Sequence, residues 1–387
     1  MSLVSSELSQ LRDVTAARVE RVVELAQRIC VVPSPTGHEQ QRGEFVASLL
    51  RERGYTPNID EVGNVYVRRG ERGKGPVLMI LAHLDTVFPF STPIIPRREG
   101  DILYGPGIGD NSLSVAAMIS VLDVLDALGW ETDADIIAVA DVGEEGLGDL
   151  RGARAAVKRY QADLGAVIVL DGNLGSIVNV AVGSKRWRIN VRGQGGHSFG
   201  AFGRPSAIHG LGKIIAALAD MQVPRNPKTT FNVGVIEGGT TVNTIAASAT
   251  ALLDLRSTEG EALERLATQA REIITHRAGE GLSTEIEVLG ERPAGMRSLS
   301  DPLVQLAAQS LRWLSLEPHY EASSTDANVP IGLNIPAVCV GITQVEQFHT
   351  VEEHIYISPI GNGLAQAVRL CIEASTLIAS SHHERRN

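Results

Sequence analysis

Cysteine is scarce in this sequence: only Cys30, Cys339 and Cys371 occur among 387 residues. They lie far apart and form no Cys-x-x-Cys pair, which argues against both a disulfide framework and a thiolate metal site. The N-terminus lacks a positive start followed by an apolar segment, and no run of about eighteen apolar residues occurs. We therefore expect a cytoplasmic protein that has no membrane segment.

Basic residues are also in the minority. The sequence has 35 lysines and arginines against 45 aspartates and glutamates, so its formal net charge is −10. Aromatic residues make up only 4% of the chain, and no basic run is interleaved with them. This composition disfavours a nucleic-acid partner and favours a small-molecule or peptide substrate.

The first part of the chain has the pattern of a doubly wound α/β domain. Residues 1–55 predict two helices separated by VVPSPTGHEQ, where Thr36 and Glu39 have the spacing of a capping box. Short apolar runs at 76–83, 134–141 and 164–171 then predict strands that are buried on both faces. The segment between the first two runs has apolar residues at helical spacing. Strand, helix and strand in this order are typical of an open α/β sheet.

From about Gly183 the order changes to strand, helix, strand, strand, helix, strand. This βαββαβ order predicts a ferredoxin-like α+β domain inserted as a lid into the α/β domain. After Pro293 a helix, an apolar strand and a closing helix resume the first pattern. We therefore predict one catalytic α/β domain formed by 1–182 and 293–387, interrupted by a lid domain at 183–292.

Acidic residues and histidines gather where the predicted strands end. His83 and Asp85 are two residues apart at a strand end, so their side chains project from the same side. The imidazole can bind a metal while the carboxylate accepts its other N–H and orients the ring. When no other candidate ligand is present, the histidine of such a pair is more often a hydrogen-bonded core residue than a metal ligand. Further candidates occupy equivalent places, at or just beyond the carboxyl ends of strands or before a helix, where open α/β sheets build their sites. They are Asp110, Glu144, Glu145, Asp171 and His349.

This set of side chains suits a pair of metal ions. Two zinc ions that share a bridging carboxylate need about five protein groups and a water. Nitrogen and oxygen ligands without thiolates suit zinc, cobalt or manganese in a hydrolase. Glu144 and Glu145 are adjacent, so one can bind metal while its neighbour accepts the proton of the attacking water. The residues themselves leave open which glutamate has which role.

Four motifs resemble those of a known family. LAHLDTVFP resembles the first metal motif of the aminoacylase, carboxypeptidase G and peptidase T family of two-zinc hydrolases. GPGIGDNSLSVAA resembles the segment of its bridging aspartate, GEEGLGDLRG its paired glutamates, and FHT its last histidine. The motifs occur in the family's order, and the resemblance covers essentially the whole chain, including the inserted domain.

The resemblance implies a role for each candidate. One zinc would be held by His83, Asp110 and Asp171. The other would be held by Asp110, Glu145 and His349, so that Asp110 bridges the two. Asp85 would orient His83, and Glu144 would be the general base.

The resemblance also implies functional residues in the lid domain. His197 would reach across a homodimer interface formed by this domain and stabilise the oxyanion in the partner's active site. Asn243 would lie near the substrate. Apart from the resemblance, the bidentate guanidinium of Arg256 suits a substrate carboxylate, although a structural salt bridge explains this arginine equally well. Asp326, in a Thr-Asp-Ala turn, would support the site.

Two departures from the family pattern bear on the substrate. Asn111, Ser112 and Leu113 follow the bridging aspartate, where many members have lysine and glycines. Asp171 is an aspartate, as in members similar to aminopeptidases and aminoacylases, whereas the glutamate-releasing carboxypeptidases usually have glutamate. The first departure weakens any transfer of substrate specificity, and the second favours an aminopeptidase or aminoacylase.

Several functions fit these features. The first is an aminopeptidase of the tripeptidase kind, and the second is an N-acyl-amino-acid deacylase or carboxypeptidase with the same chemistry. A non-catalytic binding module is a third hypothesis, but such a module has no need of the general base Glu144. A nucleotide-binding protein is a fourth, yet no Gly-x-Gly-x-x-Gly motif follows a predicted strand.

Overall fold

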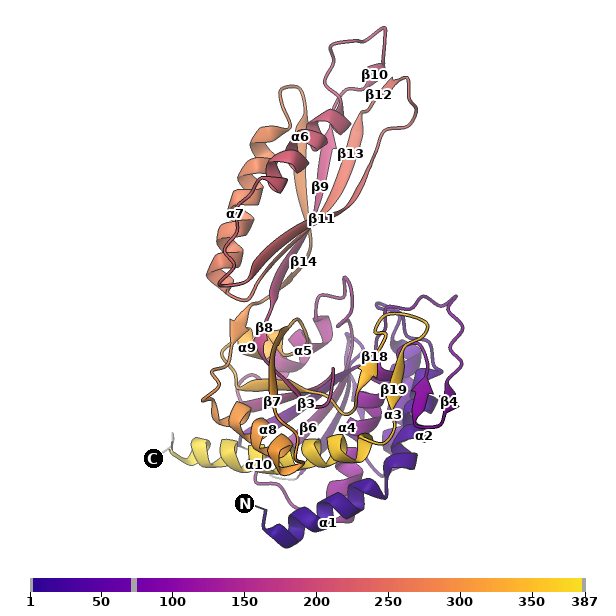
Figure 1. The fold of residues 1–387 in the computed structure, drawn as a ribbon, viewed down its shortest axis with the longest axis vertical. Coiled ribbons are helices and arrows are strands. Elements are labelled where there is room, and N and C mark those ends of the chain that lie inside the picture. The colour runs from indigo at the N-terminus through magenta and orange to yellow at the C-terminus, as the bar shows by residue number, and fades with distance from the viewer. Residues whose placement is uncertain (1–2, 71–74, 385–387) are drawn as a thin grey trace. The chain divides into compact units, whose positions relative to one another are not determined.

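The computed structural model describes residues 3–70 and 75–384. The chain divides into two compact units (Figure 1). The first unit comprises Met1–Ala181 and Arg297–Asn387, and the inserted unit comprises Val182–Met296. Each is described by itself below.

The first unit contains helices along most of its length. They are α1 (Ser5–Ala16), α2 (Val19–Cys30), α3 (Gln40–Arg51), the short helical turn η1 (Ile108–Ser112), α4 (Leu113–Ala127), α5 (Arg151–Tyr160), α8 (Pro302–Trp313), α9 (Asn328–Gly332) and α10 (Ile360–Glu384). Its strands are β1 (Asn58–Ile59), β2 (Val65–Arg69), β3 (Val77–His83), β4 (Arg97–Glu99), β5 (Ile102–Tyr104), β6 (Asp135–Asp141), β7 (Leu164–Leu170), β8 (Ser176–Ala181), β16 (His319–Ser323), β17 (Ala337–Val340), β18 (Val345–Glu346) and β19 (His354–Tyr356).

The main sheet of this unit has the strand order β1-β2-β6-β3-β7-β17-β8, and β16 pairs with β8. Strand β3 is parallel to both β6 and β7, and β7 is parallel to β17. The parallel strands at its centre therefore end at the same edge, which is where open α/β sheets form their sites. A second, small sheet has the order β18-β19-β5-β4.

Helices cover both faces of the main sheet. Along β3 the side chains of Leu78 and Ile80 join a large core with α2, α4, α8 and α10, whereas Met79 and Leu81 join a smaller core with α5. Every residue of β3 and β6 is buried for this reason. The predicted doubly wound α/β arrangement is confirmed.

One stretch of helix, Ile108–Ala127, is long and apolar enough to cross a membrane by length and composition, a feature that the sequence analysis did not predict. In the structure 94% of this window is buried inside the first unit. It is the central helix of the larger core, and core helices pass the same test.

The inserted unit consists of β9 (Gly183–Arg192), β10 (Gly196–His197), α6 (Ala207–Ala219), β11 (Thr229–Gly238), β12 (Thr244–Ile245), β13 (Ser248–Ser257), α7 (Gly260–Arg277), β14 (Ser283–Arg292) and β15 (Gly295–Met296). Four antiparallel strands form a sheet of order β11-β13-β9-β14. Alternate residues of β13 are buried in a core shared with α6 and α7. This is the ferredoxin-like fold that the βαββαβ order predicts.

Three local predictions were wrong. The first predicted helix is broken into α1 and α2 near Ala17 and Arg18. The capping box does not form, because Thr36 donates to Asp85 and Glu39 pairs with Arg151. The third strand of the predicted βαββαβ order, which we expect to run without a break over 242–257, is divided into β12, which pairs with β10, and β13.

Candidate metal centre

The five predicted metal ligands come from separate elements of the first unit. His83 is the last residue of β3, and Asp171 directly follows β7. Glu145 lies in the loop between β6 and α5, Asp110 in η1, and His349 after β18. Because β3, β6 and β7 are adjacent and parallel, three of these positions meet at one edge of the sheet.

The structure brings these side chains into two groups that share one aspartate. His83, Asp110 and Asp171 form one group, and Asp110, Glu145 and His349 form the other, with the ligand atoms of each group within 4.8 Å of one another. Asp110 Oδ1 lies 3.0 Å from His83 Nε2, and Asp110 Oδ2 lies 3.0 Å from His349 Nε2. One carboxylate oxygen thus faces each group, as a bridging ligand requires.

These contacts fit a cation better than a set of internal hydrogen bonds. Among the described residues, buried His83 Nε2 and Glu145 Oε1 have no hydrogen-bond partner of good geometry. Each nevertheless lies close to an opposite charge, since Glu145 Oε1 is 3.1 Å from His349 Nε2. Nitrogen and oxygen atoms of histidines and carboxylates that converge in this way are the expected donor set of a divalent metal.

The electrostatics of the site point the same way. Burial and the neighbouring charge of Asp110 raise the pKa of Glu145 to about 9 and that of Asp171 to about 7. The hydrogen bond to Asp110 raises the pKa of His349 to about 9. Carboxylates crowded in this way repel one another, and a bound cation relieves the repulsion.

Access to the site is asymmetric. The side chain of His83 is 1% exposed, whereas that of His349 is 53% exposed. The backbone of His349 also has a positive φ of 62°, which is uncommon for a residue with a side chain and occurs often at functional sites. Catalytic metal sites keep an open side for the substrate, and here the open side is that of His349.

Asp85 contacts His83 and also holds the backbone of the paired glutamates. The nearest acceptor to His83 Nδ1 is the main-chain carbonyl of Asp85 at 3.0 Å, whereas the carboxylate oxygen Oδ1 lies 3.6 Å away. The carboxylate instead accepts the main-chain N–H groups of Glu144 and Glu145 at 3.0 and 2.9 Å. Burial opposes its ionisation, but the hydrogen bonds and the charge of His83 lower the pKa of Asp85 to about 2.

Glu144 is buried beside the two groups but belongs to neither of them. Its negative charge contributes to the raised pKa values of Glu145 and Asp171, which places it close to both. The adjacent glutamates therefore have different surroundings: Glu145 faces His349, and Glu144 does not take part in that contact.

Sequence reasoning missed two acids near the site. Glu353 Oε1 accepts the N–H groups of Gly109 and Asp110 at 2.8 and 2.9 Å and so holds the backbone of the shared aspartate. Asp141, the last residue of β6, lies beside Asp326, and burial raises the pKa of both carboxyls above their usual range. Glu353 follows the FHT motif by three residues, and Asp141 precedes the paired glutamates by three, so proximity to the motifs was the only signal.

The inserted unit brings together two of its three candidates. His197 in β10 pairs with Thr244 in β12, and the carbonyl of Asn243 accepts the N–H of Ser198. His197 Nδ1 accepts the N–H groups of Phe199 and Gly200, so its proton is on Nε2, which is free to donate.

Arg256 lies elsewhere in the inserted unit. It is near the end of β13 that is far from the β10–β12 pair, where its Nε donates to Asp254 at 2.7 Å. This contact is the structural salt bridge that the sequence analysis gave as the alternative for Arg256. His197 and Asn243 therefore form one cluster in this unit, and Arg256 stands apart from it.

Two family models match the chain. A peptidase dimerisation domain matches residues 181–282, and peptidase family M28 matches residues 64–195. The first match covers most of the inserted unit, and the second covers the segments that carry His83, Asp110, Glu145 and Asp171. The predicted resemblance to metal-dependent peptidases is confirmed by these matches.

Individual relatives are similar over different lengths. A peptidase M20 domain-containing protein of Schizosaccharomyces pombe is 28% identical over 62% of this chain, and the alignment spans 61% of its own length. The structure of aminopeptidase PepT from Bacillus cereus has a TM-score of 0.76 and 24% identity, covering 92% of this chain and 99% of its own. A tripeptidase structure from Staphylococcus aureus has a TM-score of 0.79 and 21% identity over the same shares. These structural similarities establish the fold.

Proposed function

We propose that the chain, which matches a peptidase dimerisation domain and peptidase family M28 over parts of its length, is a two-metal hydrolase of short peptides. The observation that carries the proposal is the pair of three-residue groups that share Asp110. A sheet edge that concentrates this many carboxylates, with two histidines among them, is costly unless cations are bound there.

We assign the ligands as the geometry groups them. His83 and Asp171 would hold one metal and Glu145 and His349 the other, and Asp110 would contribute to both groups. When bound, such a pair of ions supplies Lewis acidity and lowers the pKa of the attacking water. Ligands of nitrogen and oxygen without thiolate suit Zn²⁺, and Co²⁺ or Mn²⁺ suit the same set.

Glu144 is the proposed general base. It is buried beside the ligands without belonging to either group, and Asp85 fixes its main-chain N–H. In this assignment the Glu144 carboxylate accepts a proton from the attacking water and then donates it to the leaving amine, as a general base does in amide hydrolysis. Asp85 acts through the main chain of Glu144 and Glu145, and its carbonyl orients His83.

His197 is proposed to act in a second copy of the chain. Its Nε2–H is available as a donor because Nδ1 accepts two main-chain N–H groups. A hydrogen bond from Nε2 to the developing oxyanion stabilises the transition state, and Asn243, in the same cluster, would contact the substrate. The match to a dimerisation domain supports a homodimer in which His197 serves the partner's site.

A tripeptidase-like aminopeptidase is the substrate class that we favour. The names of the two similar structures, an aminopeptidase and a tripeptidase, support it. The ion pair between Arg256 and Asp254 reduces the case for a carboxylate-binding arginine, which an N-acyl-amino-acid deacylase or carboxypeptidase would need. Those two activities remain the alternative. The three cysteines are free and buried, which fits our proposal of a cytoplasmic location.

The test is an activity screen combined with metal analysis. Protein purified without chelator should contain about two divalent ions per chain. It should hydrolyse tripeptides with a free amino terminus faster than the same peptides with an acetylated one, when supplied with zinc, cobalt or manganese. Faster release from N-acetyl amino acids would favour the deacylase. A protein that binds no metal even after addition would contradict the two-metal hydrolase and favour a binding module.

A further inference from the structure

The loop Gly143–Leu150, called here the catalytic loop, is held by contacts from the segment Thr36–Glu39. Thr36 Oγ1 donates to Asp85 Oδ2 at 2.8 Å. Asp85 in turn accepts the N–H groups of Glu144 and Glu145. One end of the segment therefore supports the acceptor that fixes the start of this loop.

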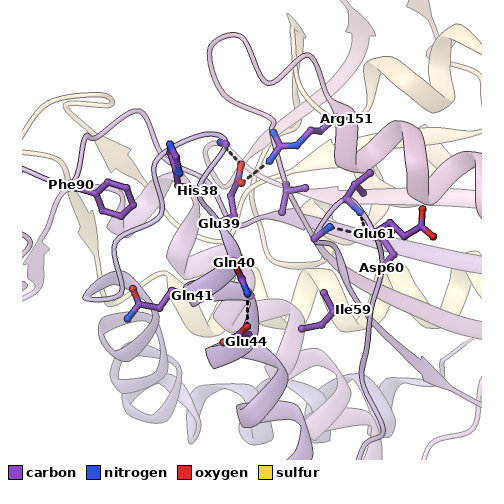
Figure 2. A pocket seen from close by; sticks show the side chains of 15 residues that line it. His38, Glu39, Gln40, Gln41, Glu44, Ile59, Asp60, Glu61, Phe90 and Arg151 are labelled. Atoms are coloured by element: carbon purple, nitrogen blue, oxygen red, sulfur yellow. Dashed lines mark hydrogen bonds and ion pairs between the residues drawn. The ribbon is translucent and has the colours of Figure 1, made fainter.

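The other end of the segment contacts the residue that follows the catalytic loop. Glu39 Oε2 lies 2.6 Å from Arg151 Nη2, and Glu39 Oε1 accepts the N–H of Gly37 at 2.8 Å. Figure 2 shows the two side chains facing each other across these contacts. The Glu39 side chain is only 5% exposed, so its charge depends on Arg151 for compensation.

The guanidinium of Arg151 packs on the first residue of the catalytic loop. A Cβ built on Gly143 would lie 2.0 Å from Arg151 Nη1 and 2.8 Å from Cζ. Arg151 therefore occupies the space that any side chain at position 143 would need. The backbone of Gly143 has a φ of 74°, and its carbonyl accepts the N–H of Leu150, which closes the loop.

A pocket of about 850 Å³ lies beside this contact, and Glu39, Val142 and Arg151 are among the residues that line it (Figure 2). Because this space is open, the long side chain of Arg151 has room to leave Gly143 once its partner is lost. The ion pair with Glu39 is the contact that directs the guanidinium onto the backbone that precedes Glu144.

We propose that Glu39 and Arg151 are a positioning pair that fixes Gly143 and thereby the carboxylate of Glu144. This inference rests on the proposed function, in which Glu144 is the general base. Neither residue touches the substrate in this proposal, because both act through the backbone of the loop. A displacement of a catalytic group by about 1 Å lowers the rate by roughly 10²-fold, so a small movement of the loop has a large effect.

Kinetics on variants that remove one or both charges test the pair. Glu39→Gln, Arg151→Gln and the double variant should each lower kcat by roughly 10²-fold with little change in KM and with full metal content. The double variant should be no worse than the single ones, because the two residues act as a unit. The matched control is Glu44→Gln. Glu44 also lines the pocket, where it accepts a hydrogen bond from Gln40, and its variant should keep wild-type kcat.

Arg151→Lys separates positioning from simple charge compensation. Lysine retains the positive charge opposite Glu39 but has no flat group to pack on Gly143. The proposal predicts a fall in kcat of at least about tenfold for this variant, at unchanged thermal stability. Wild-type kcat in Arg151→Lys would overturn the proposal, and so would wild-type kcat in Glu39→Gln.

Hydrogen exchange provides a readout that does not need activity. In Glu39→Gln the amides of the catalytic loop should exchange at least about tenfold faster than in the wild type, and in Glu44→Gln they should not. Unchanged exchange in Glu39→Gln would overturn the positioning pair whatever the enzyme hydrolyses. If the wild type hydrolyses no peptide while the exchange result holds, the proposed function fails and the structural pair stands.

Discussion

Glu144 and Glu145 are identical neighbours, and we propose different roles for them. Their N–H groups both donate to Asp85, so the backbone is fixed at both positions. Glu145 lies 3.1 Å from His349 and belongs to a candidate ligand group, whereas Glu144 belongs to neither of the two groups found among the described residues. The side chains therefore diverge from a shared anchor.

This divergence gives a prediction for single substitutions. Glu144→Ala should retain both metals and lose several orders of magnitude in kcat with a smaller change in KM, because proton transfer and water positioning are lost together. Glu145→Ala should lose metal, because it removes one of three ligands from its group. Metal content by elemental analysis and steady-state kinetics check both. Equal metal content in the two variants would show that the division of roles is wrong.

The titration of the ligands predicts how pH affects the metal-free protein. The pKa of Glu145 is raised from 4.5 to about 9, and that of His349 from 6.5 to about 9. An acid and a base with raised pKa values both bind more protons in the folded state than in the unfolded state. Stability therefore falls as the pH rises from about 5 to 9.

With chelator present, the Tm of the protein should decrease steadily over this pH range. With zinc present, the decrease should be abolished or reversed, because deprotonated ligands bind metal more tightly and binding stabilises the folded state. Glu145→Gln should flatten the slope of the metal-free protein. A Tm that rises with pH in chelator would contradict the sign of these shifts. Differential scanning fluorimetry at matched ionic strength is sufficient.

The candidate ligands could be found from sequence because each follows a strand or precedes a helix, and the carboxyl ends of parallel strands meet. The contact of the Asp85 carboxylate with the backbone of Glu144 and Glu145 could not be found in this way. This carboxylate accepts N–H groups about sixty residues further along the chain, and no local pattern reveals such a contact. Glu353 was missed for the same reason, since its acceptor role depends on the backbone of Gly109 and Asp110.

At the scale of elements, Gly152 shows how tightly α5 packs against β6. A Cβ on Gly152 would lie 2.4 Å from the main-chain nitrogen of Val142 and 2.5 Å from its oxygen. These are backbone atoms that cannot move aside easily. The helix can therefore begin directly after the catalytic loop only because residue 152 has no side chain.

Gly152→Ala should accordingly destabilise the first unit by about 1–3 kcal/mol through overpacking, although alanine is the better helix former. Gly212→Ala is the matched control in α6. Nothing lies within 4 Å of its Cβ position, so this substitution should stabilise the inserted unit by about 0.5–1 kcal/mol. Chemical denaturation of both variants measures whether each substitution raises or lowers the free energy of unfolding. Stabilisation by both alanines would mean that α5 does not pack as closely as described.

The types of the helices and strands could largely be predicted from the sequence, but the points at which these elements are interrupted could not. The apolar runs at 76–83 and 134–141 predicted β3 and β6. The interruption between β12 and β13 depends on pairing of β12 with β10, which is a tertiary contact. The break between α1 and α2 has no glycine or proline to signal it.

At the scale of the whole molecule, the sheet order β2-β6-β3-β7-β17 decides which strand ends become neighbours. The sequence predicted most of these strands without specifying their order, because order is set by how the connecting helices pack. The strand order of the inserted unit was easier to predict, because the βαββαβ order has one common arrangement. The assembly of the chain with other copies is specified neither by the strand pattern of the first unit nor by the βαββαβ order of the inserted unit.

The inserted unit has features that suit assembly with a second copy. β11 is an edge strand of its sheet, and it exposes the apolar side chains of Val235 and Ile236. An edge of this kind is a template for pairing with another chain. The loops next to His197 also expose Phe199 and Phe202, which are 88% and 90% accessible. We therefore predict a homodimer formed by the inserted unit, with His197 acting in the partner's site.

Complementation between two inactive variants tests this arrangement. His197→Ala and Glu144→Ala should each be nearly inactive alone. After random subunit exchange about half of the dimers are mixed, and each mixed dimer has one site that combines intact Glu144 with the partner's intact His197. The mixture should therefore recover up to about a quarter of wild-type activity. If exchange is demonstrated by mass spectrometry and the mixture stays inactive, His197 either works within its own chain or makes no contribution. A surface histidine in a turn would then explain its position equally well.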